Sequence, residues 1–316
     1  MKFQCKECKE EFASRKSFHC HLKAHSLRIG DYYVKHYKRR DLFTKDLLPF
    51  KNYEQYFEND FSSFENYLSW LDSNDTDVVQ PYILNKANSK FEEKEVTVSP
   101  PNLYYQLAEM ADINQCKKIF GSYSKFLEKT KLEPWFNKNI PENFWGQNCD
   151  HLKIFIDTRE KTPIVFDNSI QQKLDFGDYT VGGDLYTKTF VDRKAQDDFR
   201  QTFGKDINRF RREMDRCVKF NCYMFVVVES SIDKIEEDNK DSKFKSNLSF
   251  VWHNLRHLII DYPKNLQIIF ACSRSGTKKI IPKILYYGDQ LWNVDLQYHI
   301  DMKINNDSKK IINLSK

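Results

Sequence analysis

The chain has 316 residues, a formal net charge of +5 and an isoelectric point near 8.6. Hydrophobic residues make up 40% and aromatic residues 15%, which is enough for a real core and excludes a mainly disordered chain. No run approaches the roughly 18 to 20 apolar residues that span a bilayer, and the first residues lack a signal peptide's apolar stretch. We therefore expect a soluble intracellular protein, in the cytoplasm or nucleoid of its host cell and with no membrane partner, whose mild basicity fits a nucleic-acid partner.

The first residues carry side chains at metal-ligand spacing. Two residues separate Cys5 from Cys8, twelve follow to His21, and three lie between His21 and His25. Two thiolates on a tight hairpin and two imidazoles one helical turn apart can close a tetrahedron around Zn²⁺, which stabilises a segment too short to fold alone. Residues 3–25 resemble a C2H2 zinc finger, and the resemblance implies a structural zinc ion.

The same resemblance points the side chains of Ser14, Ser17 and Cys20 at base edges, and these short side chains discriminate bases weakly. We therefore expect the finger to anchor phosphates rather than read sequence. A structural or protein-binding finger is the alternative. The basic side chains expected to contact DNA here are Arg15, Lys16 and Lys23.

From Leu152 onward the pattern alternates between apolar runs and charged, periodic stretches. The apolar runs predict strands at 153–156, 187–191, 223–228 and 266–271. The stretches between them predict helices at 197–219 and 250–260. This order indicates a mixed α/β sheet with helices packed on it.

A second group of charged residues stands on and beside the second predicted strand. Residues two apart in a strand share a face, so Asp192 and Lys194 project together while Arg193 points away. Asp178, on a neighbouring segment, can join Asp192 around a divalent ion. Such an ion can polarise a phosphodiester, and Lys194 can steady the developing negative charge. Oxygen ligands favour Mg²⁺ or Mn²⁺. The alternative is a plain turn followed by a solvated strand end.

The surroundings of these residues resemble the XPF-type nuclease domain, whose signature is Gly-Asp, a variable stretch, Glu-Arg-Lys and a later Asp. The matching residues are Gly177, Asp178, Arg193, Lys194 and Asp198. Asp192 stands where the family has Glu, so its carboxylate reaches one methylene less far. The stretch Arg209–Glu213 is similar to the family's Arg-Leu-x-x-Gln helix.

This resemblance covers roughly residues 154–285 and implies a restriction-endonuclease-like fold, Mg²⁺ dependence and DNA cleavage. It implies that Asp157 lies near the metal, that Arg159 lies near a phosphate, and that Asp198 belongs to the catalytic set. The family's pair of helix-hairpin-helix units is absent from the sequence, so a preference for branched DNA does not follow.

Basic residues also gather outside these motifs. A run of basic residues after the proposed metal site is suited to contact a DNA phosphate backbone. The alternative is that these residues form the solvated face of a helix. The middle region interleaves basic and aromatic residues, as stacking and phosphate contact require, and loosely resembles segments of phage-type homing endonucleases. The residues expected to contact DNA are Arg39 and Arg40 in the middle region, and Arg209 and Arg212 after the metal site.

The predicted organisation is a zinc finger (1–28), a mainly helical middle region that contacts DNA (29–150), a nuclease domain (151–302) and a flexible tail (303–316). We expect a metal-dependent endonuclease that hydrolyses duplex DNA, of the site-specific homing type, acting as a monomer or a homodimer. A repair or recombination nuclease for branched DNA and a non-catalytic DNA-binding regulator are the alternatives.

Overall fold

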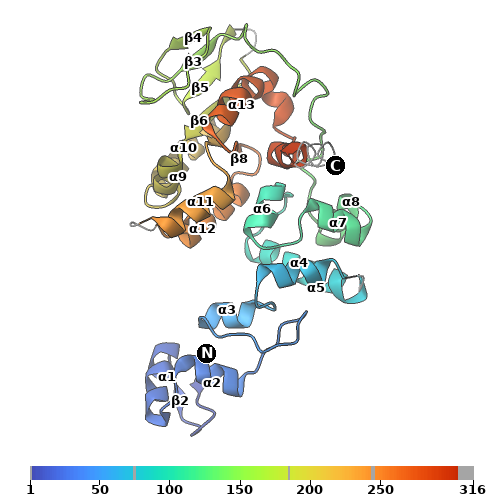
Figure 1. Ribbon diagram of the computed structural model, residues 1–316, viewed down its shortest axis with the longest axis vertical. Helices are drawn as coiled ribbons and strands as arrows, with labels where there is room; N and C mark the ends of the chain where they lie inside the picture. Colours follow the sequence, from blue (N-terminus) through green and yellow to red (C-terminus); the bar gives the residue numbers. More distant parts are fainter. Residues whose placement is uncertain (1, 74–75, 184–185, 243–245, 305–316) are drawn as a thin grey trace, which may run out of the picture. The chain divides into compact units, whose positions relative to one another are not determined.

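The computed structural model describes residues 2–73, 76–183, 186–242 and 246–304, drawn as coloured ribbons in Figure 1. The chain divides into two compact units, Met1–Gln80 and Pro81–Lys316. Within the described ranges, every helix is either too short or too polar to cross a membrane. Residues 305–316, most of the predicted tail, lie outside the described residues.

The N-terminal unit begins with the expected ββα arrangement. Its elements are β1 (Phe3–Gln4), β2 (Glu11–Phe12), α1 (Arg15–His21) and the 3₁₀ turn η1 (Leu22–His25). The two strands pair antiparallel, and the Ser14 side chain caps α1 by accepting a hydrogen bond from the backbone N–H of Ser17.

Three further helices complete this unit: α2 (Ile29–His36), α3 (Tyr53–Glu58) and α4 (Phe64–Leu71). The ββα element and the first two of these helices share one hydrophobic core. In it, Phe18 and Leu22 of the ββα element pack with Tyr32, Tyr33 and Tyr56. The segment that holds the cysteines and histidines therefore shares its hydrophobic core with α2 and α3 and does not pack as a separate module.

The second unit opens with a helical region, as predicted. Its helices are α5 (Thr76–Glu93), which begins before the boundary between the units, α6 (Asn102–Leu107), α7 (Ile113–Phe120) and α8 (Tyr123–Thr130). Local sequence sets where α7 begins and ends. Asp112 and Gln115 form a capping box at its start, and Gly121 ends it in the left-handed conformation.

A six-stranded mixed sheet forms the centre of the second unit. Its strands are β3 (Ile154–Ile156), β4 (Ser169–Gln171), β5 (Tyr179–Val181), β6 (Thr189–Lys194), β7 (Tyr223–Val228) and β8 (Leu266–Phe270). The spatial order is β4-β3-β5-β6-β7-β8. Strands β6, β7 and β8 run parallel, whereas β5 is antiparallel to both of its neighbours. The predicted mixed α/β sheet is confirmed.

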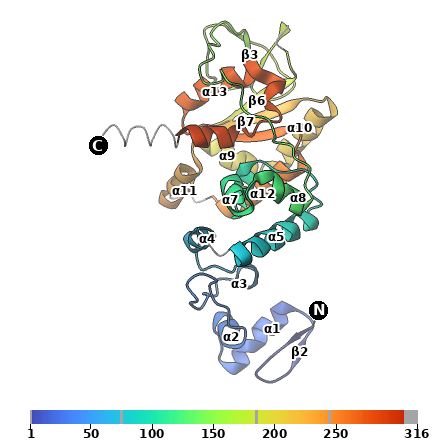
Figure 2. The same ribbon diagram turned by 90° about the vertical axis from the view of Figure 1, so that its right-hand side faces the viewer.

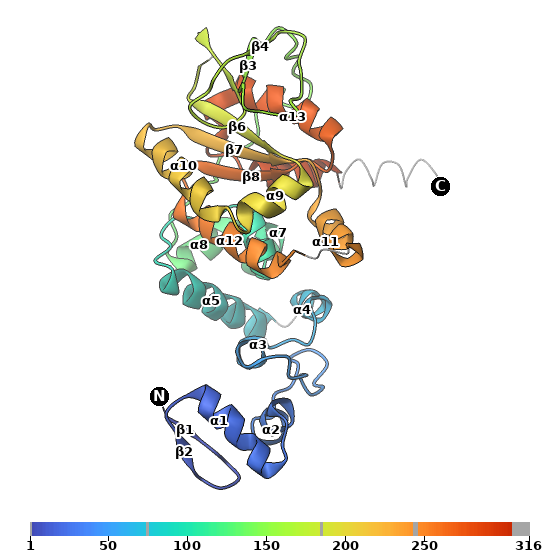
Figure 3. The ribbon, with the colours of Figure 1, turned by 90° about the vertical axis from the view of Figure 1, so that its left-hand side faces the viewer.

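Helices cover both faces of this sheet, as Figures 2 and 3 show. They are α9 (Gln196–Phe203), α10 (Ile207–Lys219), α11 (Ile232–Asp241), α12 (Leu248–Asp261) and α13 (Arg274–Tyr287). Helix α13 packs against β5, β6 and β7, while α9, α10 and α12 contact β6, β7 and β8 respectively. With both faces covered, β7 is buried along its whole length, which explains its uninterrupted apolar sequence.

Two sequence expectations need correction. The stretch predicted as one helix over 197–219 forms two helices, and the chain turns at Gly204, where a Cβ atom would lie 2.6 Å from the carbonyl oxygen of Arg200. The strand predicted to end at Val191 continues to Lys194, so Asp192 and Lys194 lie within it. Asp192 and Lys194 therefore share one face of a strand that pairs with β7 along its whole length.

Candidate active site in the second unit

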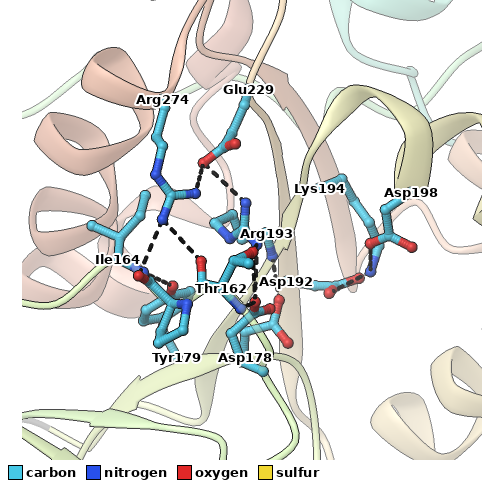
Figure 4. A network of polar contacts seen from close by, with 12 residues as sticks. Thr162, Ile164, Asp178, Tyr179, Asp192, Arg193, Lys194, Asp198, Glu229 and Arg274 are labelled. Carbon is cyan, nitrogen blue, oxygen red and sulfur yellow. Dashed lines mark hydrogen bonds and ion pairs between the residues drawn. The ribbon is translucent and has the colours of Figure 1, made fainter.

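Strand β6 places a carboxylate and an ammonium group side by side. The Nζ atom of Lys194 lies 2.7 Å from Oδ1 of Asp192 and 3.4 Å from Oδ2 of Asp198 at the start of α9 (Figure 4). Asp192 and Lys194 are both buried, whereas Asp198 is half exposed. The structure thus brings together three of the predicted catalytic residues.

Asp178 is held next to this pair by the glycine before it. Gly177 has a φ of +56°, and a Cβ atom there would lie 2.8 Å from the carbonyl oxygen of Val191, so only glycine fits. The backbone N–H of Asp178 donates to that same carbonyl at 2.8 Å. Its Oδ2 accepts from the N–H of Arg193 at 2.7 Å. A loop residue is thereby fixed against β6.

The pKa values of Asp178 and Lys194 are both raised in this site, for different reasons. Burial, reinforced by the charge of Asp192, raises the pKa of Asp178 well above its ordinary value. Burial alone would lower the pKa of Lys194, but the charges of Asp192, Asp178 and Asp198 outweigh it and hold that pKa above its ordinary value. Lys194 is therefore a permanent cation at neutral pH, suited to stabilising negative charge and unsuited to accepting a proton.

Arg193 points to the other face of β6, as the strand period predicts, and ties the surrounding loops together. Its guanidinium lies 2.9 Å from Glu160 and 3.0 Å from Glu229, and it donates to Oγ1 of Thr162 at 3.0 Å. Arg274 at the start of α13 makes a second contact to Glu229 at 3.0 Å. Figure 4 shows Arg193, Glu229 and Arg274 beside the carboxylates of Asp178 and Asp192. The network fixes the loop after β3 against the ends of β6 and β7.

Asp157 and Arg159 form a pair of their own. The Arg159 guanidinium spans both carboxylate oxygens of Asp157 and donates to the carbonyl of Leu174 at 2.7 Å. Burial opposes ionisation of Asp157, but hydrogen bonds from Arg159 lower its pKa below the ordinary value. The backbone N–H of Asp157 donates to the carbonyl of Asp178 at 2.8 Å, so the pair borders the site. The Asp157 carboxylate is occupied by Arg159.

A further carboxylate near this site belongs to Glu213 on α10, which the sequence places in a motif but gives no role in the site. Its Oε1 accepts from the backbone N–H of Gly177 at 3.2 Å. Burial raises its pKa, and the neighbouring charge of Asp192 adds to the rise. In the sequence, Glu213 reads as one acid among the bases of a solvated helix. Only the packing of α10 beneath the sheet shows that Glu213 lies near Gly177 and Asp192.

The donor set of this site fits a hard divalent cation. Asp178 and Asp192 each use one oxygen internally, on the Arg193 N–H and the Lys194 ammonium, and among the described residues nothing donates to the other oxygen of either. Two carboxylates with oxygens to spare, close enough to raise the pKa of Asp178, are a donor set of the kind that Mg²⁺ or Mn²⁺ accepts.

The four predicted ligands of the N-terminal unit come together. One ligand atom from each of Cys5, Cys8, His21 and His25 lies within 4.8 Å of all the others, and in the described part of the chain no other three or more His, Cys, Asp and Glu residues meet this closely. Nε2 of His21 lies 3.2 Å from Cys8 Sγ and 3.0 Å from His25 Nε2, while its Nδ1 faces Glu10 at 3.5 Å. Two sulfurs and two imidazole nitrogens fit Zn²⁺.

Three of the arginines predicted to contact DNA also make contacts within the chain, and one of them, Arg40, donates to the carbonyl of Lys45 at 2.8 Å. The Arg15 guanidinium stacks over the Tyr53 ring at 4.4 Å and pairs with Glu54 at 2.6 Å. The Arg39 guanidinium donates to the carbonyls of Tyr56 and Asn59 at 2.6 Å and 2.9 Å and pairs with Asp60. The Arg40 side chain is nonetheless exposed, as are those of Lys16, Lys23, Arg209 and Arg212.

Comparison with known proteins gives partial matches to solved structures. The chain is similar to XPF from Aeropyrum pernix, with 17% sequence identity over 44% of this chain and 67% of that one, and a TM-score of 0.33. It is similar to the same protein in complex with DNA, with 17% identity over 43% of this chain and 64% of that one, and a TM-score of 0.32. This chain thus spans about two thirds of the length of each. No family model and no curated protein matches the chain.

Proposed function

We propose that the protein is a metal-dependent DNA endonuclease that hydrolyses phosphodiester bonds. The observation that carries the proposal is the convergence of Asp178, Asp192 and Lys194, with the ammonium 2.7 Å from the Asp192 carboxylate. Two carboxylates able to hold a divalent ion, next to a lysine that stays protonated, suit a reaction whose transition state gathers negative charge on phosphate.

Each residue of the site has a defined part in this proposal. Asp178 and Asp192 hold Mg²⁺ or Mn²⁺, and that ion, when bound, supplies a Lewis acid for the phosphodiester. Lys194 stabilises the charge that develops on the phosphate oxygens, and Asp198 keeps the ammonium in position at 3.4 Å. The exposed Arg159 side chain, 62% accessible and anchored by Asp157, contacts a neighbouring phosphate.

The N-terminal unit is proposed to hold DNA through a Zn²⁺-bound finger. The exposed side of α1 and η1 carries Lys16, Lys23 and the short side chains of Ser17 and Cys20. Such a surface anchors phosphates and discriminates bases weakly. Arg40, Arg209 and Arg212 are proposed as further phosphate contacts, because their side chains remain exposed.

We propose the site-specific, homing type of endonuclease, because one chain joins a DNA-anchoring finger to a hydrolytic site. The experiment is to incubate the Zn²⁺-loaded protein with long duplex DNA and with fork and flap oligonucleotides, in Mg²⁺ or in EDTA, and to map the ends. Cuts at one duplex position support the homing type. Cutting of branched DNA alone would favour a repair or recombination nuclease, and binding without cuts a regulator. Light scattering on the same sample distinguishes monomer from homodimer.

A further inference from the structure

Helix α10, which packs against β7 (Figure 3), carries a row of basic side chains on its exposed face. Residues three or four apart lie on one face of a helix. The exposed residues that follow this spacing, here called the basic row, are Arg209, Arg212, Arg216 and Lys219. At 1.5 Å per residue the row is about 15 Å long. Among the described residues, the ion pair made by α10 is that of Arg211 with Asp261, and the basic row takes part in none.

The two acidic side chains of α10 are engaged by other parts of the fold. Asp215 accepts from the Tyr262 hydroxyl at 2.7 Å, and Glu213 accepts from the N–H of Gly177 at 3.2 Å. Within the basic row, the Arg216 guanidinium lies over the ring of Phe176 at 5.7 Å rather than against a carboxylate. The exposed face of α10 is therefore suited to a polyanion.

The basic row ends at an aromatic surface. Phe220, directly after Lys219, is 59% exposed, and its ring lies 6.1 Å from that of Phe176. Phe176 lies 5.4 Å from Phe190 on β6, and Phe190 lies 6.4 Å from Tyr186, which is 47% exposed. Phe176 and Phe190 are buried, so they support the two outer rings from beneath. Exposed aromatic side chains that cluster in this way mark a binding surface.

The combination of cations and exposed rings favours one kind of polyanion. Cations bind the phosphates of any nucleic acid, but a ring can stack only on a base that is not already stacked in a duplex. Phe220 is the better platform of the two outer rings, because its neighbours Arg216 and Lys219 are cations, whereas the exposed carboxylate of Asp175 acts on Tyr186.

The aromatic surface also adjoins the proposed cleavage site. Phe176 directly precedes Gly177 and Asp178, and Gly177 donates to Glu213 on α10 itself. The loop that carries a proposed metal ligand is thus the loop whose ring contacts Phe220. A DNA strand bound along the basic row lies next to the residues proposed to cut it.

We propose that α10 binds single-stranded DNA, with phosphates on the basic row and an unpaired base stacked on Phe220. The inference rests on the proposed function for the choice of DNA as the polyanion, and it requires neither the divalent ion nor cleavage. A second copy of this chain is the other occupant that the exposed rings could accept. The unpaired cations beside the rings argue against it, because a second copy would bring the same positive charge.

The test separates stacking from charge. Fluorescence anisotropy is measured on the full-length, Zn²⁺-loaded protein without added Mg²⁺, so that bound DNA stays uncut. One probe is an oligothymidylate of about 12 nucleotides, and the other is an abasic strand of the same length. The abasic strand carries the same phosphates and offers no base to stack.

Three substitutions of exposed aromatic residues isolate the ring of Phe220. Phe220→Leu keeps an apolar side chain and removes the ring, whereas Phe220→Trp keeps a ring. Phe250→Leu changes another exposed aromatic residue, 47% exposed at the start of α12, and is the matched control. Arg212→Gln removes one charge from the basic row.

We expect Phe220→Leu to bind oligothymidylate about tenfold more weakly than wild type and the abasic strand within about twofold. Phe220→Trp and Phe250→Leu should bind both probes as wild type does. Arg212→Gln should weaken the binding of both probes by the same factor, because a phosphate contact does not depend on the base.

Equal affinity of wild type for the two probes, or unchanged oligothymidylate affinity in Phe220→Leu, would overturn the inference. A dimer that dissociates in Phe220→Leu while oligothymidylate affinity is unchanged would assign the surface to a second copy instead. Base-dependent binding by a protein that cuts no DNA in Mg²⁺ would keep the single-strand surface and remove the nuclease proposal.

Discussion

The ammonium of Lys194 lies 2.7 Å from the carboxylate of Asp192, two residues earlier on the same strand. Strand geometry alone brings the two together, and the pairing of β6 with β5 and β7 fixes where they point. Because the surrounding carboxylates hold the pKa of Lys194 above its ordinary value, its charge does not vary over the pH range in which proteins are assayed.

Replacing Lys194 by Ala should therefore abolish cleavage while DNA binding and the fold persist. Loss of one preorganised charge at a reacting phosphate costs about 10² to 10³ in rate. The measurement is the single-turnover cleavage rate beside a filter-binding assay and a circular dichroism spectrum. Lys234→Ala, on the exposed face of α11, serves as the control. An unchanged rate in Lys194→Ala would remove the lysine from the site.

Arg193 should matter for stability far more than Arg274, although both contact Glu229 at 3.0 Å. The Arg193 side chain is 5% exposed and lies between two carboxylates, so Arg193→Met leaves buried negative charges unpaired and should cost about 3 to 5 kcal/mol. Arg274 is 49% exposed, and Arg274→Met should cost about 1 kcal/mol or less. Urea unfolding of the two variants checks the difference. Equal losses would contradict the assigned role of Arg193.

Removing the metal ligands of the N-terminal unit should unfold more than the finger. Phe18 and Leu22 share their core with Tyr32 and Tyr56, and the backbone N–H of Lys6, between the two cysteines, donates to the Tyr32 hydroxyl at 2.8 Å. We therefore expect the substitution Cys8→Ser, or chelation of zinc, to expose the amides of α2 and α3 to hydrogen exchange.

Cys20→Ser is the matched control for this experiment, because Cys20 is exposed and lies outside the ligand cluster. Amides in the sheet of the second unit should keep their protection in both variants. Retained protection of α2 and α3 in the Cys8→Ser variant would show that these helices fold without the metal.

Stability of the second unit should fall as the pH rises from about 4 to 6, through Asp295. Its carboxylate is buried and accepts from the N–H groups of Asn102 and Tyr298, yet burial raises its pKa from 3.8 to about 6. Between these values the folded state binds more protons than the unfolded state. Raising the pH therefore destabilises the fold, by about 3 kcal/mol at most.

The Asp295→Asn variant isolates this effect, since an amide does not titrate. It loses one of the two accepted hydrogen bonds and should be less stable than wild type at pH 4.5. The difference from wild type should shrink as the pH rises to 7, where the wild-type carboxylate is charged. Urea unfolding at both values is the measurement, and a difference that stays constant would contradict the raised pKa.

The sequence predicts the parts of this fold that depend on local pattern. Continuous apolar runs identify β7 and β8, and the Cys/His spacing identifies the ligand cluster. Strands β4 and β5 have three residues each, too few to show a period, and they exist because β3 offers them partners. Gly177 and Asp178 are recognisable as a motif, but the close approach to Val191 that requires the glycine is visible only in three dimensions.

What each charged side chain contacts could not be predicted, because it depends on how distant elements pack. Arg39 reads as a DNA contact but is held by backbone carbonyls and Asp60, and Arg15 is held by Tyr53 and Glu54. Glu213 reads as a solvated acid, yet the burial of α10 turns it toward Gly177. Spacing within one strand is local information, whereas these contacts span tens of residues.

Asp192 and Lys194 on β6 are proposed to hydrolyse DNA together with a divalent ion. The most direct measurement compares wild type, Asp192→Ala and the control Asp215→Asn on long duplex DNA in Mg²⁺ and in EDTA, with the ends mapped. We predict discrete cuts in Mg²⁺ for wild type and the control, and none in EDTA or for Asp192→Ala. Cuts that persist in Asp192→Ala, or that form equally in EDTA, would contradict the account.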